Sequence, residues 1–470
     1  MPGCLWAVAL LAAALAATAS AADKTVLYAS GGFLSVGGVA ADNVVAWNGS
    51  HWSALGAGLT LTSQAIRVYA VTQAWSSIYV GGGFQYPVAG LARWDGVSWT
   101  MVGGGISPGG SVWVFLNYQD GFLAGGLFYA AGEVPAASIA HWNGRAWSAL
   151  GAGFSGVVTT LCVQNGLLYA GGDFAVSPSG AVFNGVAAWD GQAWTALQSG
   201  LNWNYYNNPY SAGVVYALLP YKGDLIVGGT FTGAGTVPLR YVGRWNGTAW
   251  SALGVTDDGL EYAVIDMTLG LDGVLTVGGY VHWSRSTALG RVAKWTGTTW
   301  VDFSGGSGVM GDHVGTFAVA FGSLFVGGDI ISAGSASTTG VARWNGASWS
   351  SIGSFNNGDF APIVDFLLAG CQLGWTGPAC SVCDFGSYGT NCARCQIGTY
   401  ADAVGREACT LCPPNAVTLS TGSYHIQQCL CKAGCYGPAG GPCIGSQLYR
   451  AHGGVLETSR ARWLTPPLAR

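Results

Sequence analysis

The chain has 470 residues, of which 50% are hydrophobic and only 9% are charged, and its formal net charge is −4. This length allows a sizeable core and more than one domain. The small net charge, the 77 glycines and the lack of any Lys/Arg run exclude a highly charged disordered chain and a nucleic-acid-binding surface.

The chain begins with an apolar leader. Residues 5–19 are apolar and run into Ala19-Ser20-Ala21, a small-x-small cleavage pattern. We therefore predict a secretory signal peptide over residues 1–22. The alternative is an N-terminal membrane anchor, but a helix needs about 20 apolar residues to cross a bilayer. Since no other apolar run is long enough for a span, we predict a protein that is secreted or displayed at the cell surface.

A tryptophan cassette recurs through the next part of the chain. Each copy holds two tryptophans five residues apart around a turn, as in W-N-G-S-H-W at 47–52. The seven copies are Trp47/Trp52, Trp94/Trp99, Trp142/Trp147, Trp189/Trp194, Trp245/Trp250, Trp295/Trp300 and Trp344/Trp349. Their first tryptophans are 47, 48, 47, 56, 50 and 49 residues apart. A period near 50 residues is typical of a repeat architecture.

Each repeat contains four short β-rich runs separated by glycines. In one copy the first two runs are residues 157–163 and 166–174, and the third and fourth lie within residues 186–197. Gly-Gly follows the second run at 81–82, 125–126, 171–172, 228–229, 278–279 and 327–328. Four strands in each of seven units predict an all-β protein, a seven-bladed β-propeller over residues 23–369. The Asn-Gly pair predicts a hairpin turn whose two central residues both adopt positive φ. The tryptophans are expected to pack between neighbouring blades.

The two ends of the repeat region predict how the ring closes. Residues 25–28 match the second run of a unit, whereas residues 363–368 match a first run with no unit after it. We therefore expect one blade to combine three N-terminal strands with one C-terminal strand.

The repeat resembles a known kind of unit. The order of an apolar strand, L-Y-V-G-G, V-A-x-W-[ND]-G and x-W-S-A-L resembles a kelch repeat and is similar to the propellers of the galactose-oxidase/kelch superfamily. The motif V-A-x-W-N-G-x-x-W-S-A-L-G also resembles repeats of fungal cortical polarity-marker proteins. This resemblance implies the fold and leaves the activity open, because one fold hosts many functions.

Eleven of the 13 cysteines fall in one short segment of the chain. They are Cys371, Cys380, Cys383, Cys392, Cys395, Cys409, Cys412, Cys429, Cys431, Cys435 and Cys443. Such density in an exported chain predicts disulfides. Three C-x2-C pairs also suggest zinc, but zinc needs reduced thiolates. Because eleven is an odd number, one cysteine lacks a partner within the segment, and spacing leaves the connectivity open.

The cysteine-rich region, predicted over residues 370–443, resembles two module types. From Cys371, C-x8-C-x2-C-x8-C-x2-C with G-W-x-G and G-x-Y-G resembles EGF and laminin-type EGF modules. Further on, G-T-Y, C-P-P-N and C-x-C resemble ephrin-receptor-like and TNF-receptor-like repeats. Residues 444–470 are predicted to form an unstructured tail.

No catalytic residue, cofactor or metal is predicted. A copper radical oxidase needs a Tyr–Cys pair, a second Tyr and two His, whereas His51, His141, His282 and His313 stand in no such setting. Cys162 lies in an apolar run, where a buried thiol is expected. The sequence contains no nucleophile elbow, phosphate loop or H-E-x-x-H. Calcium binding by loop carboxylates such as Asp173, Asp329 or Asp257-Asp258 stays open, although no EF-hand spacing supports it.

One insertion breaks the period, at residues 198–212. Its candidate binding residues are Trp203, Asn204, Tyr205, Tyr206 and Tyr210, which combine rigid aromatics with adaptable amides. Insertions in repeat arrays map to loops on one face, often the binding face. Two sequons predict glycosylation at Asn48 and Asn246.

These features predict a non-catalytic recognition or adhesion protein that binds an extracellular protein or glycan. The alternatives are a carbohydrate-active enzyme that uses the propeller axis, and the ectodomain fragment of a membrane receptor. The sequence does not predict the oligomeric state.

Overall fold

The computed structural model describes residues 24–59, 67–84, 90–202, 213–254, 259–284, 287–304, 308–358, 361–373, 375–376, 380–433, 435–441 and 443–445. The predicted signal peptide, the candidate binding residues 203–210 and most of the predicted tail lie outside these ranges. Within them, no helix has the length and apolarity of a membrane span.

The main body consists of sheets with the same strand order. Their first strands are β38 (Ile363–Cys371), β6 (Val68–Ala74), β10 (Ser111–Tyr118), β16 (Val157–Gln164), β20 (Val215–Tyr221), β26 (Val264–Leu269) and β32 (Val309–Ala320). Their second strands are β1 (Thr25–Gly32), β7 (Ser77–Gly82), β11 (Gly121–Leu127), β17 (Leu167–Asp173), β21 (Asp224–Gly229), β27 (Leu275–Gly279) and β33 (Ser323–Ala333).

The tryptophan cassettes form the outer two strands of each sheet. The third strands are β4 (Val44–Trp47), β8 (Leu91–Trp94), β14 (Ile139–Trp142), β18 (Val186–Trp189), β24 (Val242–Trp245), β30 (Val292–Trp295) and β35 (Val341–Trp344). The fourth strands are β5 (Trp52–Ala54), β9 (Trp99–Met101), β15 (Trp147–Ala149), β19 (Trp194–Ala196), β25 (Trp250–Ala252), β31 (Trp300–Asp302) and β36 (Trp349–Ser351).

The connections from second to third strands form short strand pairs. They are β2 (Ser35–Val36) with β3 (Val39–Ala40) and β37 (Phe355–Asn356), β12 (Ala130–Ala131) with β13 (Val134–Pro135), β22 (Gly233–Ala234) with β23 (Val237–Pro238), β28 (Trp283–Ser284) with β29 (Thr287–Ala288), and β34 (Ala336–Ser337) on β33.

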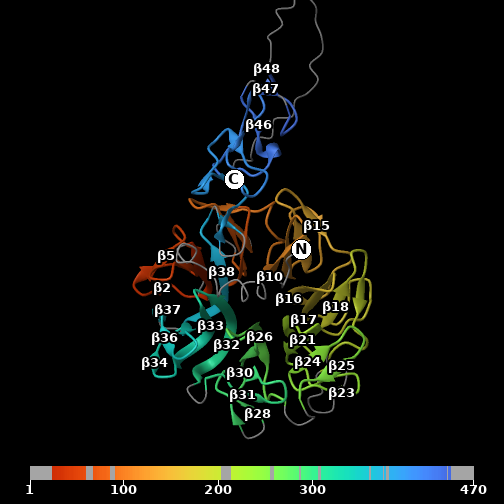
Figure 1. Cartoon of the computed structure of the whole chain (residues 1–470). Helices are drawn as coiled ribbons and strands as arrows, with labels where there is room; N and C mark the ends of the chain where they lie inside the picture. The colour runs from red at the N-terminus through yellow and green to blue at the C-terminus, as the bar shows by residue number, and fades with distance from the viewer. Residues whose placement is uncertain are drawn as a thin grey trace, which may run out of the picture.

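The first strands form a closed ring around an axis (Figure 1). Each contacts the first strand of the next sheet, in the order β38, β6, β10, β16, β20, β26, β32 and back to β38. The ring closes inside one sheet, where β1 pairs with both β38 and β4. The structure therefore confirms an all-β, propeller-type fold that is closed by an N-terminal and a C-terminal strand in one sheet.

The turn of the tryptophan cassette differs from the prediction. In the first copy only Gly49 has a positive φ, and Asn48 does not. Trp47 pairs with Trp52, so the turn has four residues. The Asn48 side chain accepts hydrogen bonds from the backbone N–H groups of Ser50 and His51, each at 3.0 Å. This side-chain capping replaces the second positive φ, and Asp or Thr can therefore stand at the same place in other copies.

Turns with two positive φ values occur instead between first and second strands. Asn165-Gly166, Lys222-Gly223 and Phe321-Gly322 adopt them with glycine second. The turn from β6 to β7 does so without glycine, at Trp75 and Ser76. Two non-glycine residues in this region store strain, which surrounding contacts must offset.

The cassette tryptophans link consecutive sheets. The indole N–H groups of four fourth-strand tryptophans donate to the carbonyl that ends the preceding cassette. These bonds are Trp52 to Ile352, Trp99 to Leu55, Trp194 to Leu150 and Trp250 to Leu197, at 2.6–3.1 Å. The repeated x-W-S-A-L motif thus serves to pack consecutive sheets against each other.

The paired glycines are explained by atoms of neighbouring strands that lie too close to leave room for a side chain. A Cβ on Gly171, the first of its pair, would lie 2.5 Å from a methyl group of Val215 in the next sheet. A Cβ on Gly172, the second, would lie 2.0 Å from the Val157 carbonyl oxygen in the same sheet. The first glycine therefore permits sheet-to-sheet packing, and the second permits a bulge in the first strand.

A β-bulge recurs near the start of every first strand. A matching register shift leaves one residue of each strand without a partner on the second strand, and β32 has further shifts that also leave Asp312 without one. These seven residues, which we call the axial ring, are Tyr69, Trp113, Thr159, Tyr216, Ile265, Gly315 and Asp365. Bulges re-aim side chains and are common near functional sites.

Side chains beside the bulges tie the first strands together. Asp266 Oδ2 accepts a hydrogen bond of 2.8 Å from the Phe317 N–H in the next sheet. Thr316 Oγ1 in turn accepts one of 3.0 Å from the Leu367 N–H. Asp266 Oδ1 also accepts from the Met267 N–H at 2.8 Å. Burial raises the pKa of Asp266 to about 7, against these hydrogen bonds, which lower it.

Asp266→Asn tests this carboxyl through the pH dependence of stability. Because the folded pKa of about 7 lies above the unfolded value of 3.8, the folded state holds more protons between these pH values, and stability falls as pH rises through that window. The asparagine keeps one acceptor oxygen and lacks the titration. We expect the variant to lose about 1 kcal/mol near pH 4 and to recover relative to the parent by pH 8. Guanidinium unfolding at several pH values measures this, and parallel pH profiles would contradict it.

The cysteine-rich region follows β38 and consists of small two-stranded sheets. Its strands are β39 (Trp375–Thr376), β40 (Val382–Cys383), β41 (Ser387–Tyr388), β42 (Ala393–Arg394), β43 (Thr399–Tyr400), β44 (Thr410–Leu411), β45 (Ala416–Val417), β46 (Leu430–Cys431), β47 (Cys435–Tyr436) and β48 (Ile444–Gly445), with a 3-10 turn, η2 (Ile426–Gln428).

Disulfides hold this region together, as predicted. The bonds join Cys371 to Cys380, Cys383 to Cys392, Cys395 to Cys409, Cys412 to Cys429 and Cys431 to Cys443. Each bond thus joins cysteines that are neighbours along the chain, except that Cys431 skips Cys435, and the bonds close successive short loops. Cys435 has no disulfide partner and accounts for the odd number.

Candidate functional site

The propeller has two unlike faces, set by strand direction. The turns from first to second and from third to fourth strands lie at one end of the strands, which we call the hairpin face. The connections from second to third strands and from sheet to sheet lie at the other end, which we call the loop face. The axial ring lies at the loop-face end, because its bulges fall near the start of each first strand.

Exposed apolar side chains gather on the loop face. In the described part of the propeller, and apart from Trp113 of the axial ring, nine large exposed hydrophobic residues lie in its connections or at its strand ends: Leu34, Met101, Leu127, Tyr129, Val182, Tyr262, Tyr280, Met310 and Ile331. Tyr129 is 78% exposed. The hairpin-face turns contain one such residue, Val97. Concentrated exposed apolar surface is typical of an interaction site.

The two faces also differ in charge. Among the described residues of the propeller, and apart from Asp266 in the middle of its strand, the loop face has eight acidic side chains and three basic ones. They are Asp42, Glu133, Asp173, Glu261, Asp302, Asp312, Asp329 and Asp365 against Arg67, Arg240 and Arg291. The hairpin face has five acidic and seven basic side chains: Asp95, Asp120, Asp190, Asp224 and Asp272 against Lys24, Arg93, Arg145, Lys222, Arg244, Lys294 and Arg343.

The axial ring is part-exposed even though it belongs to the innermost strands. The valine before each bulge is buried with 0% exposure: Val68, Val112, Val158, Val215, Val264, Val314 and Val364. By contrast, every ring residue is intermediate or exposed, and Trp113 is 37% exposed. Since the valines fill the contacts between sheets, the bulged side chains are directed toward the axis. Tyr69 and Trp113 stack there, with ring centroids 4.7 Å apart.

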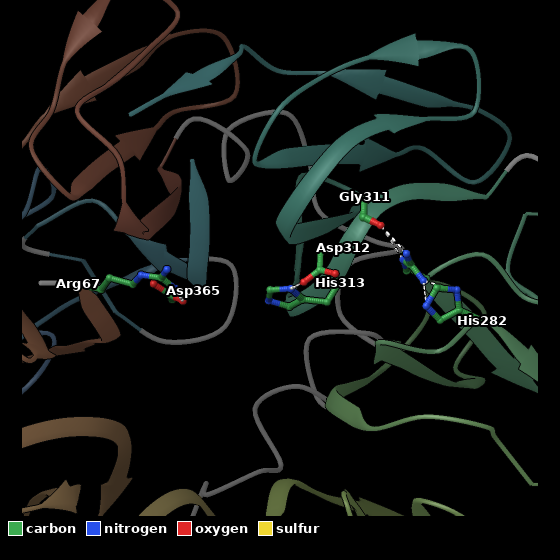
Figure 2. Close-up of polar contacts among 7 residues, drawn as sticks. Arg67, His282, Gly311, Asp312, His313 and Asp365 are labelled. Carbon is green, nitrogen blue, oxygen red and sulfur yellow. Dashed lines mark hydrogen bonds and ion pairs between the residues drawn. The ribbon is translucent and has the colours of Figure 1, made fainter. Parts of the chain in front are cut away.

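Charged groups lie along one part of the axial ring, beside Asp365 and toward β32 (Figure 2). Arg67 Nη1 lies 3.5 Å from Asp365 Oδ1. On β32, Asp312 Oδ2 lies 3.4 Å from His313 Nδ1. Further along the ring, Arg291 contacts His282 and donates to the Gly311 carbonyl at 2.6 and 2.8 Å. Figure 2 shows these groups in succession, from Arg67 and Asp365 through Asp312 and His313 to His282.

Burial and mutual charge shift several pKa values at this site. Burial raises the pKa of Asp365 to about 7, although Arg67 lowers it. The pKa of Tyr280 is raised by burial and then by Asp312 and Asp329. The pKa of His282 is lowered by burial and by Arg291. Perturbed groups gathered at one place are a mark of functional sites.

The residues singled out in the sequence fall on both faces. The exposed Asn48 and Asn246 lie in hairpin-face turns. Asp173, Asp329, His282 and His313 lie at the loop face. Asp257 and Asp258 lie outside the described residues. In the described part of the chain, no three His, Cys, Asp or Glu side chains are grouped so as to hold a metal.

The predicted binding residues Trp203, Asn204, Tyr205, Tyr206 and Tyr210 are not among the described residues. The chain on either side of them is described, and it belongs to the loop-face connection between β19 and β20. The Gly213 N–H donates to the Leu201 carbonyl at 3.2 Å.

The axial ring was not predicted from the sequence. Its signal is visible once the seven first strands are aligned on the bulge, as V-Y-A-V (68–71), V-W-V-F (112–115), V-Y-A-L (215–218) and V-D-F-L (364–367). The second position of this pattern varies from tyrosine to aspartate, whereas the first is always valine. The packing that requires the buried valine therefore does not constrain the residue after it.

The cysteine-rich region packs on part of the hairpin face. The Ser76 N–H donates to Asp384 Oδ2 at 2.6 Å, and Ser76 Oγ donates to the Phe385 carbonyl at 2.7 Å. The ring of Tyr424 stacks on Trp75 with centroids 5.4 Å apart and planes at 9°. These contacts surround the strained β6–β7 turn and hold it in place. Burial raises the pKa of Asp384 to about 6.

A family model matches this docked region. Residues 385–429 match the model described as tyrosine-protein kinase ephrin type A/B receptor-like. Residues 385–429 are an ephrin-receptor-like module. The matched residues contain the disulfides Cys395–Cys409 and Cys412–Cys429. The ephrin-receptor-like module thus contains both Phe385 and Tyr424, which contact the hairpin face.

Solved structures similar to the chain share little sequence with it. The extracellular domain of a putative one-component system from B. thetaiotaomicron is 13% identical, with a TM-score of 0.42, over 74% of this chain and 43% of that chain. This chain therefore spans less than half the length of that one. The computationally designed Ika8 protein is 14% identical, with a TM-score of 0.40, over 74% and 94%. The WD40 β-propeller domain of Doa1 is 10% identical, with a TM-score of 0.34, over 68% and 88%. No curated protein sequence matches the chain.

Proposed function

We propose that this chain is a secreted or cell-surface, non-catalytic recognition or adhesion protein. In this proposal a seven-bladed, kelch-type propeller binds an extracellular protein or glycan through its loop face, and the cysteine-rich region acts as a stalk. The observation that carries the proposal is the concentration of exposed apolar side chains on the loop face.

The occupied hairpin face supports this assignment. The ephrin-receptor-like module covers part of that face through Trp75, Ser76 and Gly144. Glycans on Asn48 and Asn246 would project from the same face. A partner therefore meets the fewest obstacles on the loop face.

The disulfides support an oxidising compartment. Five disulfides in about 70 residues are typical of exported proteins and rare in the cytosol. A cleaved leader over residues 1–22 would deliver the chain there, and mass spectrometry of the N-terminus of the secreted protein checks this.

A binding screen tests the proposal. The full chain would be screened against immobilised glycans and extracellular proteins, together with Tyr129→Asp and Val97→Asp variants. Both substitutions place a carboxylate on an exposed apolar side chain, one on each face. We expect Tyr129→Asp to weaken the binding found in the screen and Val97→Asp to leave it unchanged. Loss of binding with Val97→Asp alone would place recognition on the hairpin face and overturn the proposal.

A carbohydrate-active enzyme is a second candidate, favoured by one observation. Asp365 combines a pKa raised to about 7 with a place beside the Tyr69–Trp113 stack, as a general acid facing a sugar ring would. Hydrolysis of a glycan found in the screen, abolished by Asp365→Asn, would favour the enzyme. Binding without turnover would favour recognition.

A further inference from the structure

The loop face has the chemistry of a site for cations, and this inference rests on the proposed function because it assigns the class of partner. We propose that the axial ring and the acidic side chains around it bind the lysine or arginine side chains of a basic polypeptide. The chemical basis is an aromatic surface set among carboxylates.

The difference in charge between the two faces indicates that the partner is positively charged. Eight acidic side chains against three basic ones on the loop face attract cations, whereas the hairpin face has an excess of basic side chains. Such asymmetry steers oppositely charged partners and repels like-charged ones. An acidic glycan would be repelled, and a neutral glycan would gain nothing from the difference.

Aromatic rings lie next to carboxylates at three places in and around the axial ring. Trp113 stacks on Tyr69 next to Asp365, and Tyr280 stacks on His313, with centroids 5.0 Å apart, next to Asp312. Burial and then Asp173 raise the pKa of Tyr216, which places this tyrosine near a third carboxylate. Aromatic faces attract ammonium and guanidinium groups, and a nearby carboxylate adds an ion pair.

Asp365 has an unused hydrogen-bonding atom at this site. Its Oδ1 faces Arg67, while its Oδ2 is buried and has no hydrogen-bond partner among the described residues. A buried acceptor without a partner is costly. An incoming lysine or arginine supplies N–H donors that can satisfy it once the Asp365 side chain turns toward the axis.

A basic polypeptide explains the rest of the loop face as well. The exposed apolar residues Leu127, Tyr129 and Ile331 lie at strand ends or in connections outside the axial ring. A peptide partner can place a basic side chain at the axis and apolar side chains against these connections. A small free amine would leave them uncovered.

The test uses two peptides of equal length, one alternating lysine with glycine and the other alternating glutamate with glycine. Their binding to the full chain would be measured by calorimetry. We expect the lysine peptide to bind and the glutamate peptide not to bind. We expect binding of the lysine peptide to weaken as salt rises, because exposed charges are screened within about 8 Å at physiological ionic strength.

Matched variants locate the site. The double variant Asp312→Asn/Asp329→Asn and the variant Trp113→Ala should each weaken binding about tenfold. Asp190→Asn is the control, because it removes a negative charge from the hairpin face. Its carboxylate accepts from the Gln192 and Ala193 N–H groups, and asparagine can accept from them too. Thermal melts of each variant establish that it is folded.

Three results would overturn the inference. They are equal binding of the two peptides, no binding of the lysine peptide, and an equal loss of binding in Asp190→Asn. If a neutral partner from the screen binds the loop face while the lysine peptide does not, the cation site is wrong and the proposed function stands. If partners of every class depend on Val97 and not on Tyr129, the proposed function fails. The salt dependence of the unmodified chain gives a result even if a variant does not fold.

Discussion

Gly82→Ala is expected to destabilise the propeller by about 3 kcal/mol, because the new methyl group meets backbone atoms that cannot move aside. A Cβ on Gly82 would lie 2.2 Å from the Arg67 carbonyl oxygen and 3.0 Å from the Val68 Cα atom. That carbonyl precedes the β6 bulge, so relief of the clash would disturb Tyr69 in the axial ring. Equilibrium unfolding in guanidinium measures the loss.

The neighbouring glycine supplies the control. A Cβ on Gly83 would meet only the Tyr69 ring, at 3.7 Å or more, which is ordinary van der Waals contact. Gly83→Ala should therefore change the free energy of unfolding by less than about 1 kcal/mol. If both variants lose the same stability, the bulge does not explain the paired glycines.

Tyr424→Ala is expected to release the ephrin-receptor-like module from the hairpin face. The tyrosine is buried at 7% exposure, stacks on Trp75, and donates from its hydroxyl to the Gly144 carbonyl at 2.9 Å. Truncation of a buried aromatic side chain costs about 3–5 kcal/mol. The loss falls on the docking contact, because disulfides still hold the module itself together.

Hydrogen exchange at one amide reads out this release. The Ser76 N–H donates to Asp384 Oδ2 and is protected only while the module is docked. We expect Ser76 to exchange faster in Tyr424→Ala, while amides in the distant β26 keep their protection. Leu419→Ala is the control within the module, because Leu419 is 78% exposed. Unchanged protection at Ser76 would show that Tyr424 does not hold the module.

Much of the fold could be predicted because repetition makes its signal strong. Seven tryptophan cassettes at a regular period predicted strands, their order in each unit and the closure by residues 363–368. Spacing of this kind reflects local rules, namely hairpins, glycine packing and tryptophan burial, and these act in the same way in every unit.

The cassette turn was predicted wrongly because two local rules compete. Asn-Gly favours a turn with two positive φ values, but Asn48 caps a longer turn with its own side chain. The tighter turns appear between first and second strands, as at Asn165-Gly166. Only the pairing of Trp47 with Trp52 decides between the two.

The candidate site could not be predicted because it is assembled from seven distant segments. Tyr69 and Trp113 come from consecutive sheets, Asp365 joins them only after the ring closes, and no single segment has a motif. The difference in charge between the faces likewise depends on which end of a strand each residue occupies. The insertion at 198–212 was recognisable by its length alone, and its connection belongs to the loop face.

Oxidative footprinting of the chain, alone and with a saturating partner from the screen, tests most directly that recognition uses the loop face. Trp113, Tyr129 and Tyr280 are exposed, oxidisable and on that face. We expect the partner to protect these three side chains and to leave hairpin-face residues such as His51 unchanged. Protection of the hairpin face, with Trp113 and Tyr129 still fully reactive, would contradict the account.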